Sequence, residues 1–154
     1  MPVSPKDTAS EMLVVMPLVM RAVRAEMRSH RALRLSVPQF RSLGFVYRHP
    51  GASLSAAAEH VGLTLPAMSR LIDGLVTRKL MRRRSHTGDR RRITLDLTVR
   101  GQALWQAAYD LTQASMTRKL STLNGSECTT VAGAMRILLH LFGQGPQHNG
   151  NGST

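Results

Sequence analysis

The sequence predicts a mainly α-helical protein that carries one small β-hairpin. Apolar residues recur every three or four positions over most of the chain, which is the spacing of one face of an amphipathic helix. Between Ile93 and Thr98, by contrast, apolar and polar residues alternate, which is typical of a half-buried strand. A length of 154 residues fits one domain or one compact module with helical extensions. With six aromatic residues, the core is expected to consist mainly of Leu, Val, Ala and Met.

The first third of the chain predicts two helices. The first runs from Thr8 to about Met27 and should bend at Pro17, because proline removes a backbone donor from the helix interior. The second begins after Ser36, a favourable N-cap residue, with Pro38 in its first turn, and a His-Pro-Gly sequence stops it.

Two short helices follow. One starts at Ser53 or Ser55 and ends at the turn that Gly62 provides. Thr64 caps the next, which has Pro66 in its first turn. Two short helices separated by a tight glycine turn predict a helix-turn-helix.

A basic hairpin follows the helix-turn-helix. The strand at 93–98 is expected to pair with residues 80–85, and residues 86–90 contain the Gly and Asp that a hairpin tip favours. A helix-turn-helix followed by a hairpin wing is a winged helix.

The last part of the chain predicts a long helix capped by Thr98, a break at Asn124-Gly125 and a final helix capped by Ser126. These helices and the first are too apolar to be lone appendages, so we expect them to bury each other across a dimer two-fold axis. The predicted parts are an N-terminal dimerisation helix at 8–34, a winged helix-turn-helix DNA-binding domain at 35–98, C-terminal dimerisation helices at 99–143 and a disordered tail at 144–154.

The charge of the chain points to nucleic acid. The net charge is +12, and residues 70–99 alone hold nine basic and three acidic side chains, which is half of that excess. Most of the basic residues there are arginines, whose planar guanidinium binds phosphate with two hydrogen bonds and fits a narrow minor groove. A solvated basic surface is the simpler alternative. The composition therefore predicts double-stranded DNA as the partner.

Other classes of function find little support. The six histidines lack metal-ligand spacing, and no phosphate-binding loop, nucleophile elbow or paired carboxylates occur, so we expect no enzyme, cofactor or metal. No membrane segment is predicted. The single cysteine, Cys128, is interpreted as a small helix residue rather than a redox switch, and a cytoplasmic location is expected.

Three stretches resemble the MarR family of bacterial transcriptional regulators. They are Leu35-Ser-Val-Pro-Gln-Phe40, Leu63-Thr-Leu-Pro-Ala-Met-Ser-Arg-Leu-Ile-Asp73, and Asp89-Arg-Arg91 followed by Leu97-Thr98 and Gly101. The third is the most specific. Two positions depart from the family pattern, Gly74 and Gly88. Because a glycine inside a helix costs roughly 0.5–1 kcal/mol relative to alanine, close packing is expected at Gly74.

The resemblance implies a homodimeric repressor that binds a pseudo-palindromic operator, with recognition helices in the major groove and wings in flanking minor grooves. It places Arg70 on base edges, Arg91 in the minor groove, Arg90 on phosphate, and Asp89 in the role of holding the wing loop. Such proteins are nucleoid-associated when bound. The predicted DNA-binding residues are Ser36, Pro38, Thr64, Leu65, Pro66, Ala67, Ser69, Arg70, Arg82, Arg84, Asp89, Arg90 and Arg91.

The resemblance also implies a small-molecule effector that releases the repressor from DNA. The family's pocket lies between the dimer helices and the winged helix. This indicates a pocket lined by Met20, Arg24, Val37, Phe40 and Trp105. If Arg24 faces that cavity, a small aromatic or other amphipathic anion is the expected effector.

Two other functions are compatible with the sequence. A non-specific architectural protein of DNA or RNA would use the same basic surface without sequence choice. A protein interaction module could retain a winged helix without binding DNA, although the dense arginines of the wing argue against it.

Overall fold

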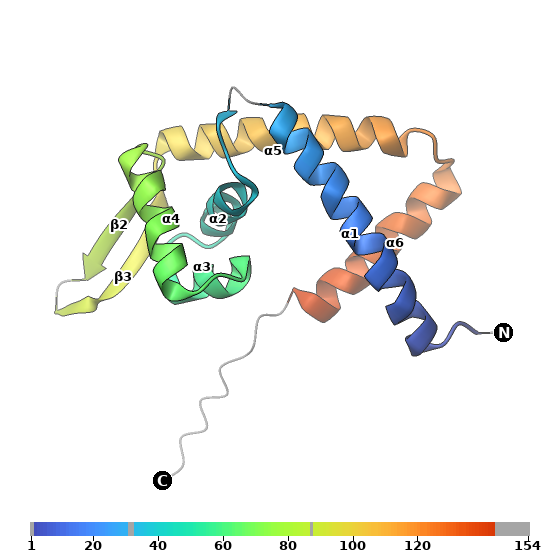
Figure 1. Cartoon of the computed structure of the whole chain (residues 1–154), viewed down its shortest axis with the longest axis horizontal. Coiled ribbons are helices and arrows are strands. Elements are labelled where there is room, and N and C mark those ends of the chain that lie inside the picture. Colours follow the sequence, from blue (N-terminus) through green and yellow to red (C-terminus); the bar gives the residue numbers. More distant parts are fainter. Residues whose placement is uncertain (1, 31–32, 87, 144–154) are drawn as a thin grey trace, which may run out of the picture. The chain divides into compact units, whose positions relative to one another are not determined.

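The computed structural model describes residues 2–30, 33–86 and 88–143, except for the side chains of residues 86 and 89–91 (Figure 1). The chain divides into two compact units, Met1–Met116 and Thr117–Thr154. The predicted tail at 144–154 lies outside the described residues. No helix in the described part of the chain is long and apolar enough to cross a membrane.

Helix α1 spans Pro5–Ser29 and so begins three residues before the predicted start. Ser4 is its N-cap: the Ser4 hydroxyl accepts from the Asp7 amide, and the Asp7 carboxylate accepts from the Ser4 amide. The helix continues as one element through Pro17. Of the residues in α1, all of which are described, Met27 is the buried one.

Helices α2 (Val37–Arg48), α3 (Leu54–Val61) and α4 (Leu65–Thr77) form the helical part of the winged helix (Figure 1). Each begins at a predicted cap, and Ser53 rather than Ser55 starts α3. Gly62 ends α3 in the left-handed conformation, with φ of 79°, which glycine adopts without strain. The core shared by these helices and the sheet includes fully buried side chains from several elements: Leu43, Val46, Ala57, Met68, Ile72, Leu75 and Leu95.

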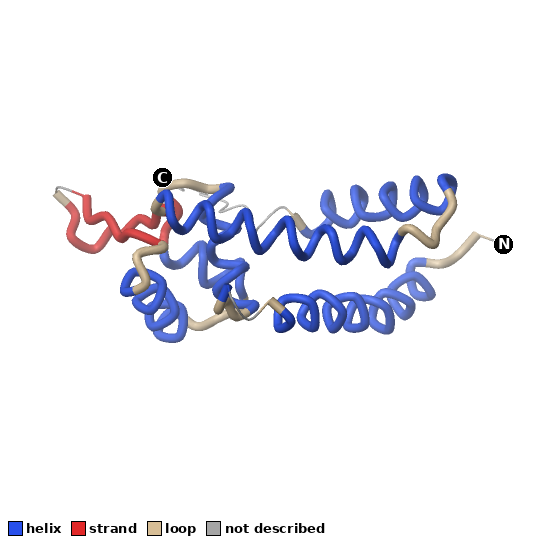
Figure 2. Tube along the Cα trace, turned by 90° about the horizontal axis from the view of Figure 1, so that it is seen from above, coloured by secondary structure: helices blue, strands red, loops and turns tan. Residues whose placement is uncertain are grey.

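The hairpin consists of β2 (Met81–His86) and β3 (Asp89–Leu97), which pair antiparallel as predicted (Figure 2). A third strand, β1 (Ala52–Ser53), pairs with the other edge of β3, giving the order β1-β3-β2. The sequence does not reveal β1, because two residues are too few to show alternation. The fold class is therefore mainly α-helical with a small antiparallel sheet, as the sequence predicts.

Helix α5 spans Val99–Leu120 and starts at the predicted cap. The Thr98 hydroxyl accepts from the Gly101 amide at 2.9 Å and donates to the Lys79 carbonyl at 2.7 Å. A Cβ atom at residue 101 would collide with the Leu80 backbone carbonyl. The Leu-Thr-x-x-Gly motif thus has a structural cause: Thr98 caps α5 and ties it to the α4–β2 turn, and Gly101 lets that turn approach.

The second unit contains α6, which spans Gly125–Phe142. Its N-cap is Asn124, paired with Glu127 in a capping box, and not Ser126 as predicted. An asparagine directly before the helix with an acid three positions into it outranks a serine two residues further on. The close packing expected at Gly74 is likewise wrong, because a Cβ atom there meets nothing within 4 Å.

Candidate nucleic-acid interface

The N-terminal half of helix α4 has one side that is exposed to solvent. Thr64, Leu65, Pro66 and Arg70 are exposed, and Leu65 is exposed to 50% despite being apolar. The opposite side of the helix is buried, with Met68, Ile72 and Leu75 at 0% exposure. Burial of one side therefore fixes which side of α4 faces outward. The other two predicted contacts on this helix, Ala67 and Ser69, are half-buried.

Arg83 on β2 connects helix α4 to the wing through its side chain. One of its terminal nitrogens donates to the Ser69 carbonyl at 3.0 Å and to the Ser69 hydroxyl at 3.1 Å. The same nitrogen lies 2.9 Å from the Asp73 carboxylate. Arg83 is not among the DNA-binding residues that the sequence predicts. The signal that could have found it is the strand register, since Arg83 lies opposite Leu95 on the face of the hairpin that includes the buried Met81 and Leu95.

Arg82 and Arg84 lie on the other face of β2, and both are exposed. The Nε of Arg84 is 2.9 Å from an Asp96 carboxylate oxygen, and the other oxygen of Asp96 accepts from the Gly51 amide at 3.1 Å. The Arg84 side chain remains 62% exposed, so its ion pair is weak and leaves donors available. Arg82 pairs in register with Asp96 and reaches solvent freely.

At the wing tip, residue 87 lies outside the described structure, and residues 86 and 89–91 are described in their backbone alone. Residues 89–92 belong to β3, and the side chain of Arg92 is exposed. The predicted roles of Asp89, Arg90 and Arg91 concern side chains that lie outside the described part of the structure.

Ser36 and Pro38, the two predicted DNA contacts at the start of α2, have structural roles in that helix. The Ser36 hydroxyl accepts from the Gln39 amide at 3.3 Å, and Pro38 lies in the first turn and is half-buried. Arg41, further along α2, donates to the His60 carbonyl at 2.7 Å and to the Val61 carbonyl at 3.2 Å. These bonds fix α2 against the C-terminus of α3.

A histidine lies at the same contact between α2 and α3. The His60 ring stacks on Phe45 with centroids 4.6 Å apart, and His49 stacks on the same Phe45 at 4.7 Å. Burial, followed by the neighbouring positive charges of Arg41 and Arg48 and by His49, lowers the pKa of His60 below its ordinary value of 6.5. His60 is therefore neutral over a wider pH range than a free histidine.

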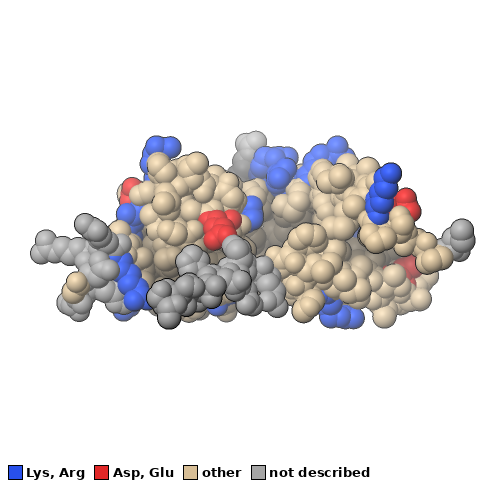
Figure 3. All heavy atoms as spheres, turned by 90° about the horizontal axis from the view of Figure 1, so that it is seen from below, with Lys and Arg blue, Asp and Glu red and all other residues tan. Residues whose placement is uncertain are grey.

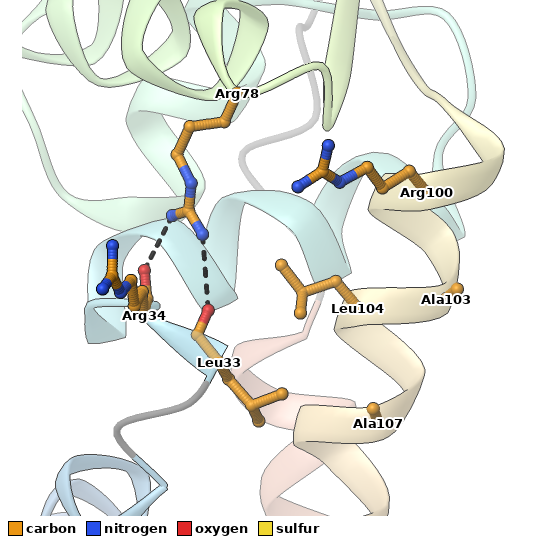
Figure 4. Close-up of a pocket in the computed structure, with 7 residues that line it drawn as sticks. All are labelled: Leu33, Arg34, Arg78, Arg100, Ala103, Leu104 and Ala107. Atoms are coloured by element: carbon orange, nitrogen blue, oxygen red, sulfur yellow. Dashed lines mark hydrogen bonds between the residues drawn. The ribbon is translucent and has the colours of Figure 1, made fainter.

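The residues predicted to line an effector pocket do not line the cavity of about 450 Å³ that lies in the first unit. Phe40 and Trp105 stack at 6.2 Å in an aromatic cluster that includes Tyr47 and Tyr109. Trp105 is only 6% exposed. Arg24 is exposed on α1, and Met20 and Val37 are half-buried. That cavity is lined by residues near the α1–α2 connection, the end of α4 and the start of α5 (Figure 4).

The chain has a net charge of +12, and Lys and Arg are more frequent than Asp and Glu on the face in Figure 3. Among the described residues, no group of three His, Cys, Asp or Glu side chains is placed to hold a metal ion. A capped, outward-facing helix joined to an arginine-bearing hairpin defines a winged helix-turn-helix protein.

Comparisons with known proteins find a similarity to one family of regulators. Residues 35–92 match the model of the MarR family. YfiV, an uncharacterised HTH-type transcriptional regulator of Bacillus subtilis, is 26% identical over 106 residues, which are 69% of this chain. The matched region spans 66%, just under two thirds, of the length of that relative. On the matched segment the chain is similar to MarR-family regulators.

Solved structures share the fold. RV1404 from Mycobacterium tuberculosis has a TM-score of 0.75 at 21% identity, covering 96% of this chain and 100% of that one. Apo MarR from E. coli has a TM-score of 0.74 at 18% identity, covering 90% and 99%. A mutant of MepR from S. aureus bound to an oligodeoxyribonucleotide has a TM-score of 0.58 at 21% identity, covering 86% and 96%.

Proposed function

We propose that this protein is a repressor that binds a pseudo-palindromic DNA operator as a homodimer in the cytoplasm, and that a small molecule releases it. The observation that carries the proposal is the outward face of α4, where Thr64, Leu65, Pro66 and Arg70 are exposed at the N-terminal end of a helix fixed by its buried side. Recognition helices contact base edges with their N-terminal residues.

Within this face, Arg70 is the residue proposed for direct base recognition. An arginine in the major groove donates two hydrogen bonds to guanine, which is the commonest specific contact between protein and DNA. Its neighbour Ser69 is held by Arg83, so the turn of α4 that carries Arg70 is braced from the wing side. Arg82, Arg84 and the tip residues Arg90 and Arg91 would contact phosphates and the minor groove.

The proposed dimer rests on apolar surface that the described chain leaves uncovered. Helix α1 exposes Leu13 to 78% and Val14 to 66%, and helix α6 exposes Leu139 to 70% and Phe142 to 71%. Apolar surface of this kind marks an interface when it is contiguous. The proposed dimerisation segments are residues 8–34 and 99–143, and a two-fold axis through them would present two copies of α4 to two half-sites.

The experiment that tests sequence recognition is Arg70→Ala, measured by fluorescence anisotropy on operator and scrambled duplexes. A sequence-specific regulator should lose about 1–3 kcal/mol of discrimination between the two duplexes. An architectural protein would instead lose only about one unit of salt slope, equally on both duplexes. That second result would contradict the proposal.

A further inference from the structure

The N-terminal end of α4 exposes apolar side chains to solvent. Leu65 is 50% exposed and Pro66 is also exposed, whereas Met68 and Ile72 on the other side of the helix are completely buried. Leu65 and Pro66 are the first two residues of the helix and directly follow its N-cap, Thr64. Two apolar side chains therefore lie at the end of α4 that is proposed to enter the major groove.

The backbone at this end of α4 has few hydrogen-bond donors to offer to DNA. A helix N-terminus ordinarily has free N–H groups, which bind phosphate or another anion. Pro66 has no N–H, and the Ala67 amide donates to the Thr64 hydroxyl at 3.3 Å. The Met68 amide donates to the Thr64 carbonyl at 2.9 Å. The first turn of α4 is therefore better suited to apolar contacts than to hydrogen bonds with phosphate.

The major groove carries one apolar group that differs between bases, the C5-methyl group of thymine. Cytosine has a hydrogen at this position unless it is methylated. We propose that Leu65 and Pro66 recognise the C5-methyl group of a pyrimidine in each half-site, which is a thymine or a 5-methylcytosine. This inference rests on the proposed function, because it names the chemical group that the exposed end of α4 selects on DNA.

The helix also predicts where this pyrimidine lies relative to the guanine assigned to Arg70. Pro66 and Arg70 are four residues apart, so their side chains lie on the same face of α4, and both are exposed. Four residues of an α-helix rise about 6 Å, and one base-pair step rises about 3.4 Å. The methyl-bearing pyrimidine should therefore lie within about two base pairs of that guanine.

The test removes the methyl group from the DNA and leaves the protein unchanged. The probe is the duplex that the full chain enriches from a random library, with thymine replaced by uracil at one position of each half-site in turn. Uracil keeps the O4 acceptor of thymine and lacks only the methyl group. At the predicted thymine, the replacement should weaken binding about fourfold in one half-site and about fifteenfold in both, measured by fluorescence anisotropy. Equal affinities for thymine and uracil at every position overturn the proposal.

Methylation of cytosine is the converse test. The predicted thymine–adenine pair is replaced by cytosine–guanine, and the duplex is prepared with and without a C5-methyl group on that cytosine. The methylated duplex should bind about fourfold more tightly for each half-site, because the added methyl group contacts the same two side chains. Methylation that leaves the affinity unchanged overturns the proposal.

Variants assign the methyl contact to α4. The double variant Leu65→Ala with Pro66→Ala should bind the thymine and uracil duplexes with a ratio of affinities near one. A general loss of affinity cancels from this ratio, and both side chains are exposed, so the fold should persist. Val3→Ala is the matched control, since Val3 is an aliphatic residue before α1 that is 68% exposed, and it should keep the full ratio. A double variant that still distinguishes thymine from uracil as the wild type does overturns the proposal.

The outcomes separate this inference from the proposed function. If no sequence is enriched from the library, the proposed function fails and the inference fails with it. If a palindrome is enriched but the wild type does not distinguish thymine from uracil, the function stands and methyl recognition is overturned. An enriched half-site without a thymine or cytosine within about two base pairs of a guanine has the same meaning.

Discussion

The winged helix buries large apolar residues in a core, whereas the two flanking helices α1 and α6 leave many of theirs exposed. In the winged helix, Leu43, Ile72 and Leu95 are fully buried in one core that α2, α4 and β3 share. In α1, Leu13 is 78% exposed, and α6 buries none of its residues although its sequence is rich in Leu, Ile and Val. Since burial of apolar surface contributes roughly 25 cal/mol per Å², the flanking helices gain little of this stabilisation from the single chain.

The apolar residues of the two regions therefore have different roles. The apolar pattern of the winged helix specifies contacts within the chain. The equally apolar patterns of α1 and α6 specify contacts that a second copy is proposed to supply.

The largest effect is expected at two helical glycines of the first unit. Gly101→Ala should destabilise the fold by about 3 kcal/mol or more, because the added methyl collides with the Leu80 backbone, which cannot rotate away. Gly74→Ala should instead stabilise it by about 0.5–1 kcal/mol, since its surroundings are open. Urea unfolding followed by circular dichroism measures both. Equal effects of the two substitutions would contradict the close packing of Gly101 against the α4–β2 turn.

A charge on a flanking helix should break the dimer while sparing the winged helix. Leu13→Asp and Leu139→Asp should each weaken self-association by about a hundredfold or more, because each buries a carboxylate in an apolar interface. Sedimentation equilibrium should show a mass falling from twice 16.9 kDa toward 16.9 kDa. Leu65→Asp is the control, since Leu65 is 50% exposed on α4 and should leave the mass unchanged. A wild type that sediments as a monomer would refute the proposed dimer.

An intermediate effect is expected at the contact between wing and recognition helix. Arg83→Met removes the bonds to Ser69 and Asp73, and should cost about 1 kcal/mol of stability because the ion pair is partly solvated. It should also reduce discrimination between operator and scrambled DNA, because Ser69 adjoins Arg70.

Arg82→Met on the opposite face of β2 is the matched control for Arg83→Met. It should lower the salt slope by about one unit and leave discrimination unchanged. If both variants lose discrimination equally, Arg83 does not position α4.

The smallest effect concerns pH. Because the pKa of His60 is lowered in the folded protein, the unfolded chain binds a proton more readily, and stability should decline as pH falls below 6.5. His60→Gln should flatten this part of the stability profile, measured by urea unfolding between pH 7.5 and 5. A profile that keeps its full slope in the variant would assign the pH dependence to other groups.

Much of the fold is predictable because local chemistry agrees with the final structure. Ser36, Thr64 and Thr98 each cap the helix that the sequence assigns to them. The two-residue β1 strand is not predictable, because only its pairing with β3 defines it. The sequence predicts Ser126 as the cap of the last helix, whereas the acid at residue 127 completes a capping box only with Asn124.

The site is less predictable than the fold, because its decisive contacts are long-range. The exposed face of α4 follows from helical periodicity, but the bond from Arg83 to Ser69 joins residues whose proximity depends on how the hairpin packs. The cavity of the first unit is lined by three segments that are far apart in the sequence, so helical periodicity alone does not predict it. Phe40 and Trp105, chosen as pocket residues, stack together in an aromatic cluster, and their role in effector binding stays a prediction.

The most direct test of the central claim is selection from a random duplex library at physiological salt, using the full chain. A dimer that presents two copies of α4 should enrich a palindrome whose half-sites lie about 10 base pairs apart. Tight, salt-sensitive binding without any enriched sequence would contradict the account and favour an architectural protein.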